Sequence, residues 1–263
     1  MVNSGRCLGG RLEKLVSICC GTTTFPGIRA VFFDKDGTLA DVEPYLRALA
    51  EGRSRALDQR VPGVGEAMQR AFGVRGDRLD PAGLMAVGTR LENEIAAATY
   101  LAAQGIPWFE ALAQVAQVFQ EADRQLPSRA PQTPPLPGIL PLLEHLTRHG
   151  VLLGVISADS PSNIQSFFDT YGLDPYFQGY VGAEPGQPTK PDPRLVYRLC
   201  DQLGVAPAEV LVVGDGQGDM EMAIAAHTAG AIAALWAWLA DPPALTASVQ
   251  LHDPSQITVI PYP

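Results

Sequence analysis

The stretch Ala30-Val31-Phe32-Phe33-Asp34-Lys35-Asp36-Gly37-Thr38-Leu39 decides the fold of this chain. Its first four residues form a short apolar run that ends at charged residues, a pattern typical of a strand buried on both faces of a parallel sheet. Asp34 and Asp36 follow at the carboxyl end of this strand, where open α/β sheets bind their ligands. Positions i and i+2 of extended backbone point to the same side, so both carboxylates can face one pocket. Two carboxylates this close repel each other, which indicates a bound cation.

The composition is that of an ordinary globular protein and excludes several classes of function. The chain has 263 residues, of which 46% are hydrophobic and 18% charged, and no apolar run approaches the ~20 residues of a membrane span. The formal net charge is −9 and no basic block is present, so neither a membrane nor a nucleic acid is an expected partner. The cysteines have no zinc-site or disulfide spacing, and reduced thiols predict a cytoplasmic protein. The oligomeric state is left open.

A second apolar run, residues 151–156, predicts another strand of the same sheet. It ends at Ser157-Ala158, and a helix is expected to begin at Ser160-Pro161 and to end at Gly172. A hydroxyl and free backbone amides between a strand end and a helix N-terminus are suited to binding phosphate.

A third apolar run, residues 210–213, leads into the glycine-rich loop Gly214–Asp219. This loop carries Asp215 and Asp219, and its glycines let the backbone pack tightly around a cation while the carboxylates face inward. Lys190 lies shortly before a helix that we expect to end at Gly204. Trp236 and Trp238, which follow a further apolar run, are expected to be packing residues rather than ligand contacts.

The segment 40–137 has helical rather than strand periodicity, and it closes with a proline-rich connector. We predict an all-helical cap inserted into an α/β core made of residues 15–39 and 138–263. Residues 1–14 lack periodicity and are expected to be a disordered extension. Residues 15–20 predict a strand joined through Gly21–Gly27 to the central one, and the C-terminal tail predicts an edge strand. The helices expected in the insert begin near Glu43 and Gly63, at Asp80-Pro81 (running to about Ala103) and at Pro107.

The motifs, taken in order, resemble those of the haloacid dehalogenase superfamily of phosphohydrolases. Asp34-Lys35-Asp36-Gly37-Thr38 matches its first motif, and Ser157 and Lys190 match the second and third. Asp215 and Asp219 match the acidic fourth motif. The long gap before Ser157 leaves room for a helical cap, whereas the gap from Ser157 to Lys190 is too short for a second large one. This arrangement resembles the phosphoglycolate phosphatase and β-phosphoglucomutase-like branch, which has a helical C1-type cap.

The resemblance implies a Rossmann-like parallel sheet and a Mg²⁺-dependent phosphatase that acts on a small phosphomonoester, either phosphoglycolate-like or a sugar phosphate. It assigns Asp34 as the nucleophile, which forms an aspartyl-phosphate, and Asp36 as the group that protonates the leaving oxygen and then activates water. Ala158 stands where the family often has a polar residue, so only its backbone can contribute. The implied phosphate-binding residues are Ser157, Ala158 and Lys190, and the implied Mg²⁺ ligands are Asp34, Asp36 through its backbone carbonyl, Asp215 and Asp219.

Two other reactions of this superfamily are disfavoured by particular residues. Asp36 argues against a dehalogenase, which protonates no leaving oxygen. A phosphonatase needs a lysine in the cap, and residues 40–137 contain none. A phosphomutase of the β-phosphoglucomutase type remains open, as does an inactive phosphometabolite-binding protein. We expect the cap to determine the substrate, and the candidate contacts there are Tyr45, Arg47, Arg90 and Asn93.

Overall fold

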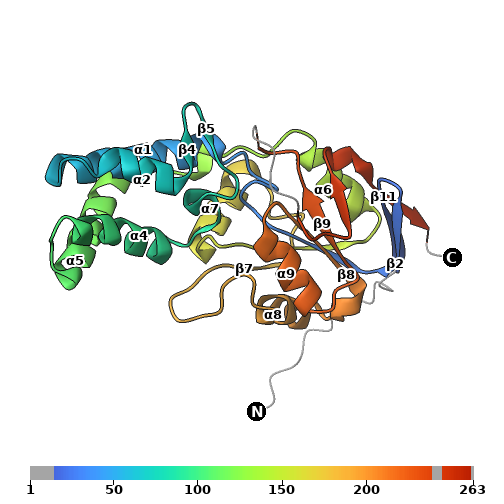
Figure 1. Cartoon of the computed structure of the whole chain (residues 1–263). Helices are drawn as coiled ribbons and strands as arrows, with labels where there is room; N and C mark the ends of the chain where they lie inside the picture. Colours follow the sequence, from blue (N-terminus) through green and yellow to red (C-terminus); the bar gives the residue numbers. More distant parts are fainter. Residues whose placement is uncertain (1–14, 239–244, 262–263) are drawn as a thin grey trace, which may run out of the picture.

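The computed structural model describes residues 15–238 and 245–261, so the extension predicted for residues 1–14 lies outside the described part. A six-stranded parallel sheet forms the centre, in the order β10-β9-β8-β3-β6-β7. This arrangement confirms the α/β class and the parallel sheet expected from the sequence (Figure 1). Its strands are β3 (Ala30–Phe33), β6 (Leu152–Ile156), β7 (Gly179–Val181), β8 (Val210–Gly214), β9 (Gly230–Ala234) and β10 (Val249–Leu251).

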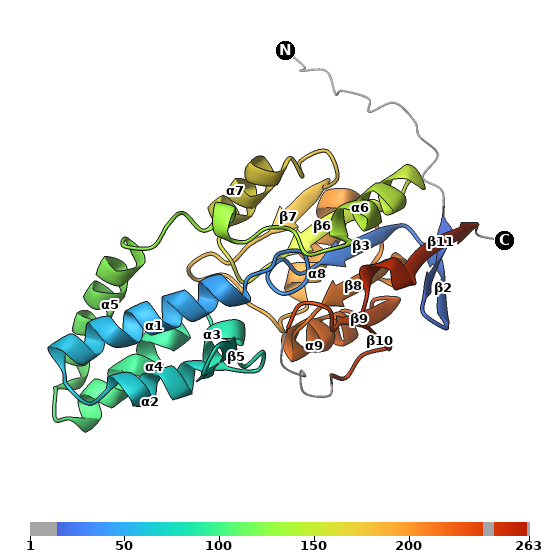
Figure 2. The same ribbon diagram turned by 90° about the horizontal axis from the view of Figure 1, so that it is seen from above.

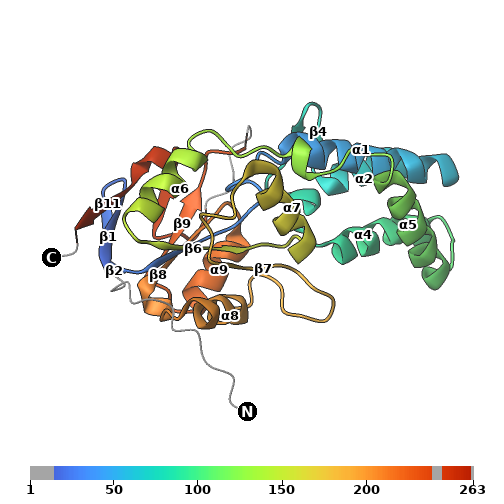
Figure 3. The same cartoon turned by 180° about the vertical axis from the view of Figure 1, so that it is seen from behind.

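Helices cover both faces of this sheet, which explains why its strands are apolar throughout (Figure 3). Phe33 and Val213 pack with α6 (Ile139–Arg148) and α7 (Pro161–Tyr171) in one hydrophobic cluster. The alternate residues Phe32 and Val212 pack with α8 (Arg194–Leu203) and α9 (Gln217–Ala225) in a second cluster. The expected cap at Ser160 and the expected ends at Gly172 and Gly204 are all present.

A small antiparallel sheet lies beside the first of these clusters. It consists of β1 (Val16–Cys20), β2 (Thr23–Ile28) and β11 (Ile257–Pro261), with β1 in the middle. The prediction that residues 21–27 only connect two strands is therefore wrong, because they contain most of β2. Gly21, with a φ of 59°, lies in the turn from β1 to β2. The C-terminal tail supplies two edge strands where one was predicted, because β10 lies at the edge of the large sheet and β11 at the edge of the small one.

The insert has a hydrophobic core of its own, separate from the two clusters of the sheet (Figure 2). It is not entirely helical, because a two-stranded hairpin follows α2. The linker back to the sheet also contains a 3-10 helix, Ala130–Gln132. The elements of the insert are α1 (Glu43–Arg60), α2 (Gly65–Phe72), β4 (Val74–Arg75), β5 (Arg78–Leu79), α3 (Leu84–Val87), α4 (Arg90–Ala103) and α5 (Trp108–Asp123).

The single long helix predicted from Asp80 to Ala103 is wrong at its start. Asp80 accepts a hydrogen bond from the backbone N–H of Ala82 within a turn instead of capping a long helix. The chain forms the short helix α3 and then breaks at Gly88-Thr89. Thr89 caps α4 together with Glu92, each side chain accepting a hydrogen bond from the other residue's backbone N–H. This capping box supplies a better helix start than the continuous helix would have had.

The two connections of the insert run side by side. The N–H of Asp41 donates to the carbonyl of Pro134 at 2.8 Å, and the N–H of Leu136 donates to the carbonyl of Leu39 at 2.8 Å. Ala40 and Pro135 form an antiparallel bridge between these bonds. The insert therefore joins the sheet through a short ribbon of two hydrogen-bonded segments.

Strand register explains why the sequence motifs meet at one edge of the sheet. Phe33 of β3 is level with Val213 of β8 on one side and with Val155 of β6 on the other. The next residues along each strand therefore emerge together, which brings Asp34 beside the loop that carries Asp215. The N–H of Asp34 extends the ladder by donating to the carbonyl of Val213 at 2.8 Å.

The described helices and cysteines bear on two further expectations from the sequence. None of the described helices is both long and apolar enough to cross a membrane. Among the described cysteines, Cys19, Cys20 and Cys200 are free thiols.

Candidate active site

Asp34, Asp215 and Asp219 come together at the carboxyl edge of the sheet, and we call them the acidic triad. Each offers a carboxylate oxygen, and these oxygens lie within 4.8 Å of one another. Asp34 follows β3, Asp215 follows β8, and Asp219 lies in the first turn of α9. Asp34 and Asp219 are buried, so their negative charges gain little from solvent.

Lys190 is the cation that the fold places against the triad. Its ammonium pairs with Asp34 and lies 2.6 Å from Oδ1 of Asp219. Burial would lower the pKa of Lys190, but the two carboxylates outweigh this effect and raise it, so the side chain stays charged. With three ionised acids, one lysine leaves the cluster two negative charges in excess.

Burial raises the pKa of Asp34 to about 6, against the opposing effect of Lys190. Burial also raises the pKa of Asp215 well above its usual value, and the charges of Asp34 and Asp219 add to this rise. Both pKa shifts have the same main cause, which is burial of the carboxylate, and the negative charges of neighbouring acids add to it.

Asp215 is bound by neutral donors. The indole N–H of Trp238 donates to its Oδ2 at 2.6 Å, and the Thr38 hydroxyl donates to its Oδ1 at 3.4 Å. The expectation that Trp238 only packs is therefore incomplete. Gly37, with a φ of 78°, makes the arrangement possible, because a Cβ at this position would overlap the carboxylate of Asp215.

The Asp36 carboxylate is not part of the triad, but Asp36 lines the same cavity of about 160 Å³ as Asp34, as the sequence suggested. Its Oδ1 accepts from Lys35 and its Oδ2 accepts from Arg129 at 2.5 Å. Asp159 completes the group, because its Oδ2 lies 3.1 Å from both Lys35 and Arg129. We call these four residues the ion-pair ring. Burial would raise the pKa of Asp36, but Arg129 and Lys35 outweigh it, and the pKa is lowered.

Three members of the ion-pair ring were missed by sequence reasoning. Arg129 lies among the prolines of the return linker, where no periodicity singles it out. Asp159 lies two residues beyond the second motif, and its Oδ1 accepts from the side chain of Asn163 at 2.6 Å. Lys35 is 1% exposed, which is rare for a lysine. Its position between two aspartates was the one signal that could have drawn attention to it.

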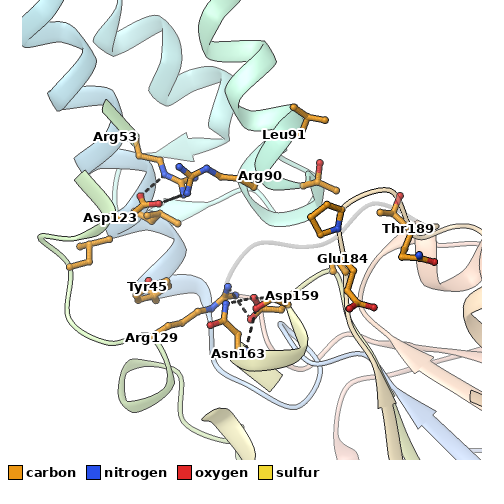
Figure 4. A pocket seen from close by; sticks show the side chains of 18 of the residues that line it. Tyr45, Arg53, Arg90, Leu91, Asp123, Arg129, Asp159, Asn163, Glu184 and Thr189 are labelled. Carbon is orange, nitrogen blue, oxygen red and sulfur yellow. Dashed lines mark hydrogen bonds and ion pairs between the residues drawn. The ribbon is translucent and has the colours of Figure 1, made fainter. Parts of the chain in front are cut away.

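A cleft of about 770 Å³ lies between the insert and the sheet, and Arg129 and Asp159 of the ion-pair ring line it (Figure 4). Tyr45 and Arg90 line it, as the sequence suggested. Arg90 is held by Asp123 at 2.5 Å, and Asp123 also pairs with Arg53 of α1. Arg129 connects the two sides, since its guanidinium lies 5.5 Å from the ring centre of Tyr45.

The other two candidates in the insert lie elsewhere. Arg47 borders a separate depression with Asp41 and Asp77, so the structure does not bring it to the cleft. Asn93 lines a cavity of about 150 Å³ that also reaches Asp36. Its side-chain N–H groups donate to backbone carbonyls of the α3–α4 break, while its buried Oδ1 has no hydrogen-bond partner among the described residues.

Two of the three predicted phosphate-binding residues line the cavity at the triad, and the third does not. Lys190 and Ala158 line a cavity of about 160 Å³ together with the whole triad. Ser157 is buried, and its hydroxyl accepts a hydrogen bond from the N–H of Asp159 at 3.1 Å. Ser157 therefore also shapes the loop that carries one member of the ion-pair ring.

Comparison with known proteins assigns the family. The family model for haloacid dehalogenase-like hydrolases matches residues 28–227, most of the chain. The chain belongs to the haloacid dehalogenase-like hydrolase family. The expected recognition from the four motifs is thereby confirmed.

Two relatives and one solved structure are similar to this haloacid dehalogenase-like hydrolase. The chain is 30% identical over 212 residues to a phosphoglycolate phosphatase of Synechococcus elongatus, which covers 80% of this chain and 84% of that protein. It is 35% identical to a phosphoglycolate phosphatase of Pasteurella multocida over 94 residues, only 36% of this chain and 41% of that protein. A haloacid dehalogenase family hydrolase of Deinococcus radiodurans has the same fold, with a TM-score of 0.57 and 20% identity, covering 87% of this chain and 93% of that one.

In this haloacid dehalogenase-like hydrolase the acidic triad fits a divalent cation. Its donors are carboxylate oxygens, the ligands that hard cations prefer. The excess of two negative charges left by Lys190 matches one divalent ion. Gly37 and Gly214 allow the backbone to pack closely against the triad, because a Cβ at either position would overlap a triad carboxylate.

Proposed function

We propose that the protein is a Mg²⁺-dependent phosphatase that hydrolyses a small phosphomonoester through an aspartyl-phosphate on Asp34. The observation that carries this proposal is the position of Asp34. It stands at the end of the central strand, against Lys190 and within reach of two further carboxylates. A carboxylate in such a site can act as a nucleophile toward phosphorus, while Lys190 and a cation held by the carboxylates would neutralise the incoming phosphate.

The reaction begins with attack of an Asp34 oxygen on phosphorus, in line with the leaving oxygen. The bond to the leaving oxygen breaks and an aspartyl-phosphate forms. Lys190 stabilises the charge on the phosphoryl oxygens, as a fixed cation in a buried site does most effectively. Asp34, Asp215, Asp219 and the backbone carbonyl of Asp36 would hold Mg²⁺, which would supply further positive charge to the phosphate site. The backbone of Ala158 and the hydroxyl of Ser157 complete the phosphate site.

Asp36 is the proposed acid and base. It donates a proton to the leaving oxygen and later takes one from the water that hydrolyses the aspartyl-phosphate. Such proton transfer is worth ~10²–10⁴-fold in rate. Arg129 holds the Asp36 carboxylate in the ion-pair ring, so Asp36 must exchange this contact for the substrate during turnover.

The substrate class follows from the cleft and from the relatives. Similarity to relatives named phosphoglycolate phosphatases supports phosphoglycolate as the first candidate. The cleft of about 770 Å³ also has room for a sugar phosphate. Tyr45 and Arg90 are proposed contacts in this cleft, and the unpartnered Oδ1 of Asn93 is a proposed acceptor for a hydroxyl of the leaving group.

The test is phosphate release from a panel of phosphomonoesters, including phosphoglycolate and several sugar phosphates. The wild type with Mg²⁺ is compared with the wild type in EDTA and with Asp34→Asn. Release that both changes abolish supports the proposal, and the preferred ester identifies the substrate. An isomerised sugar phosphate without net release indicates a phosphomutase, and no turnover of any ester indicates a binding protein.

A further inference from the structure

Asp215 is held differently from the other two members of the acidic triad. Lys190 pairs with Asp34 and Asp219. Both carboxylate oxygens of Asp215 instead accept hydrogen bonds from neutral groups, the Trp238 indole at 2.6 Å and the Thr38 hydroxyl at 3.4 Å. The indole contact is the shorter one, and its donor lies on a rigid ring that packs in the apolar core of the insert.

The fold brings Trp238 to this position through strand pairing. Gly214 at the end of β8 is level with Ala233 of β9, so the segments that follow these two strands leave the sheet side by side. Trp236 and Trp238 both lie in the segment after β9. Trp236 donates to the backbone carbonyl of Thr38 at 3.0 Å, which anchors this segment on the first-motif loop.

The hydrogen bond between Trp238 and Asp215 depends on the absence of a side chain at Gly37. A Cβ at Gly37 would lie 2.9 Å from Nε1 of Trp238 and would overlap the Asp215 carboxylate. The indole and the carboxylate therefore fit together only because the first motif has glycine there. This links the glycine of the motif to a tryptophan some 200 residues later in the chain, at position 238.

We propose that Trp238 is a positioning residue that orients the Asp215 carboxylate toward the divalent cation, so that metal affinity depends on its N–H. This inference rests on the metal site of the proposed function. An indole suits the task because it restrains the carboxylate without adding a positive charge that would compete with the cation. Groups that orient a metal ligand from behind typically contribute 10–100-fold to metal affinity.

The test measures binding of Mg²⁺ alone, without substrate, by isothermal titration calorimetry. Trp238→Phe should raise the dissociation constant about 10–100-fold. Trp236→Phe is the matched control, because its indole lies in the same segment but bonds a backbone carbonyl; its dissociation constant should change much less. Replacing Trp238 with benzothienylalanine, which keeps the shape and loses the N–H, should reproduce the loss if the hydrogen bond is responsible.

The outcomes separate this inference from the proposed function. Equal Mg²⁺ affinity in the wild type and the benzothienylalanine protein overturns the role of Trp238 while the metal site stands. Equal losses in Trp236→Phe and Trp238→Phe also overturn it, because they indicate a general disturbance of the segment. A wild type that binds no Mg²⁺ overturns both the inference and the metal-dependent function.

Discussion

The guanidinium Nη2 of Arg129 lies 2.5 Å from Oδ2 of Asp36, although 93 positions, including all the helices from α1 to α5, separate the two residues in the chain. Arg129 belongs to the linker that ends the insert, and Asp36 belongs to the loop that begins it. The candidate acid and base of the sheet domain is therefore held by the segment on which the insert is mounted. This relationship connects the position of the insert with the proton chemistry at Asp36.

Replacing Arg129 should change the pH dependence of turnover. Burial raises the pKa of Asp36, while Arg129 is the strongest of the groups that lower it. Arg129→Met removes that group, so the pKa rises and the limb of the kcat/KM profile that reports Asp36 moves to higher pH. The measurement is kcat/KM against pH, with Arg129→Lys as a control that retains the charge. A limb that stays at the same pH in Arg129→Met would contradict the assignment.

Two arginines of α1 offer a matched test of what holds the insert together. Arg53 and Arg60 both pair with acids of α5, but Arg53 is 6% exposed whereas Arg60 is 42% exposed. Arg53→Ala removes the buried guanidinium and its two hydrogen bonds to Asp123, which keeps Arg90 as a partner, and should lower the free energy of unfolding by about 1.5–3 kcal/mol. Arg60→Ala removes an exposed pair and should cost less than about 1 kcal/mol. Urea unfolding measures both, and similar losses would show that burial does not decide the effect.

Gly37 and Gly52 should respond to alanine in opposite directions. Gly37→Ala forces a positive φ on a residue with a side chain, at a cost of about 1–2 kcal/mol, and also pushes against Asp215. We expect it to lose both stability and Mg²⁺ binding. Gly52 lies within α1 with open space around it, so Gly52→Ala should raise the free energy of unfolding by about 0.5–1 kcal/mol. Thermal denaturation with and without Mg²⁺ distinguishes the two variants. Normal Mg²⁺ binding by Gly37→Ala would contradict the claim that a Cβ at this position displaces the Asp215 carboxylate.

The metal-free protein should lose stability at Asp34 as the pH rises. The pKa of Asp34 in the folded chain is about 6, above the ordinary 3.8, so between these values the folded state keeps a proton that the unfolded chain has released. The stabilising contribution is therefore complete below about pH 4 and lost as the pH passes 6. In EDTA, the unfolding free energy of Asp34→Asn relative to the wild type should increase from pH 4 to pH 7.5. A difference that does not vary with pH would refute this account.

The sequence predicts best what depends on neighbours along the chain. The apolar run before Asp34 and the glycine-rich loop after β8 were sufficient to predict the parallel sheet and the edge where the acids gather, because strand burial and turn formation are local properties. The capping box at Thr89 was equally local, yet the periodicity of the apolar residues concealed the break before α4.

Contacts across the fold were beyond such reasoning. Nothing near Arg129 in the sequence indicates that its partner is Asp36, since their meeting depends on how the linker packs on α7 and the first-motif loop. Trp238 looked like a packing residue because its apolar surroundings are evident in the sequence, whereas its hydrogen bond to Asp215 depends on the register of β8 and β9. The rest of the ion-pair ring was missed for the same reason, because Asp159 is also far from Lys35 and Asp36 in the chain.

In the ribbon formed by Leu39–Asp41 and Pro134–Leu136, the chain enters and leaves the insert at one place. The two ends of the insert leave the sheet one hydrogen bond apart, so a tight turn across that gap would suffice to close the chain without the helices between. The sheet carries its own two hydrophobic clusters, and the insert carries a third. The insert is thus a module with a core of its own on a two-stranded stem, and the whole acidic triad lies on the sheet side of that stem.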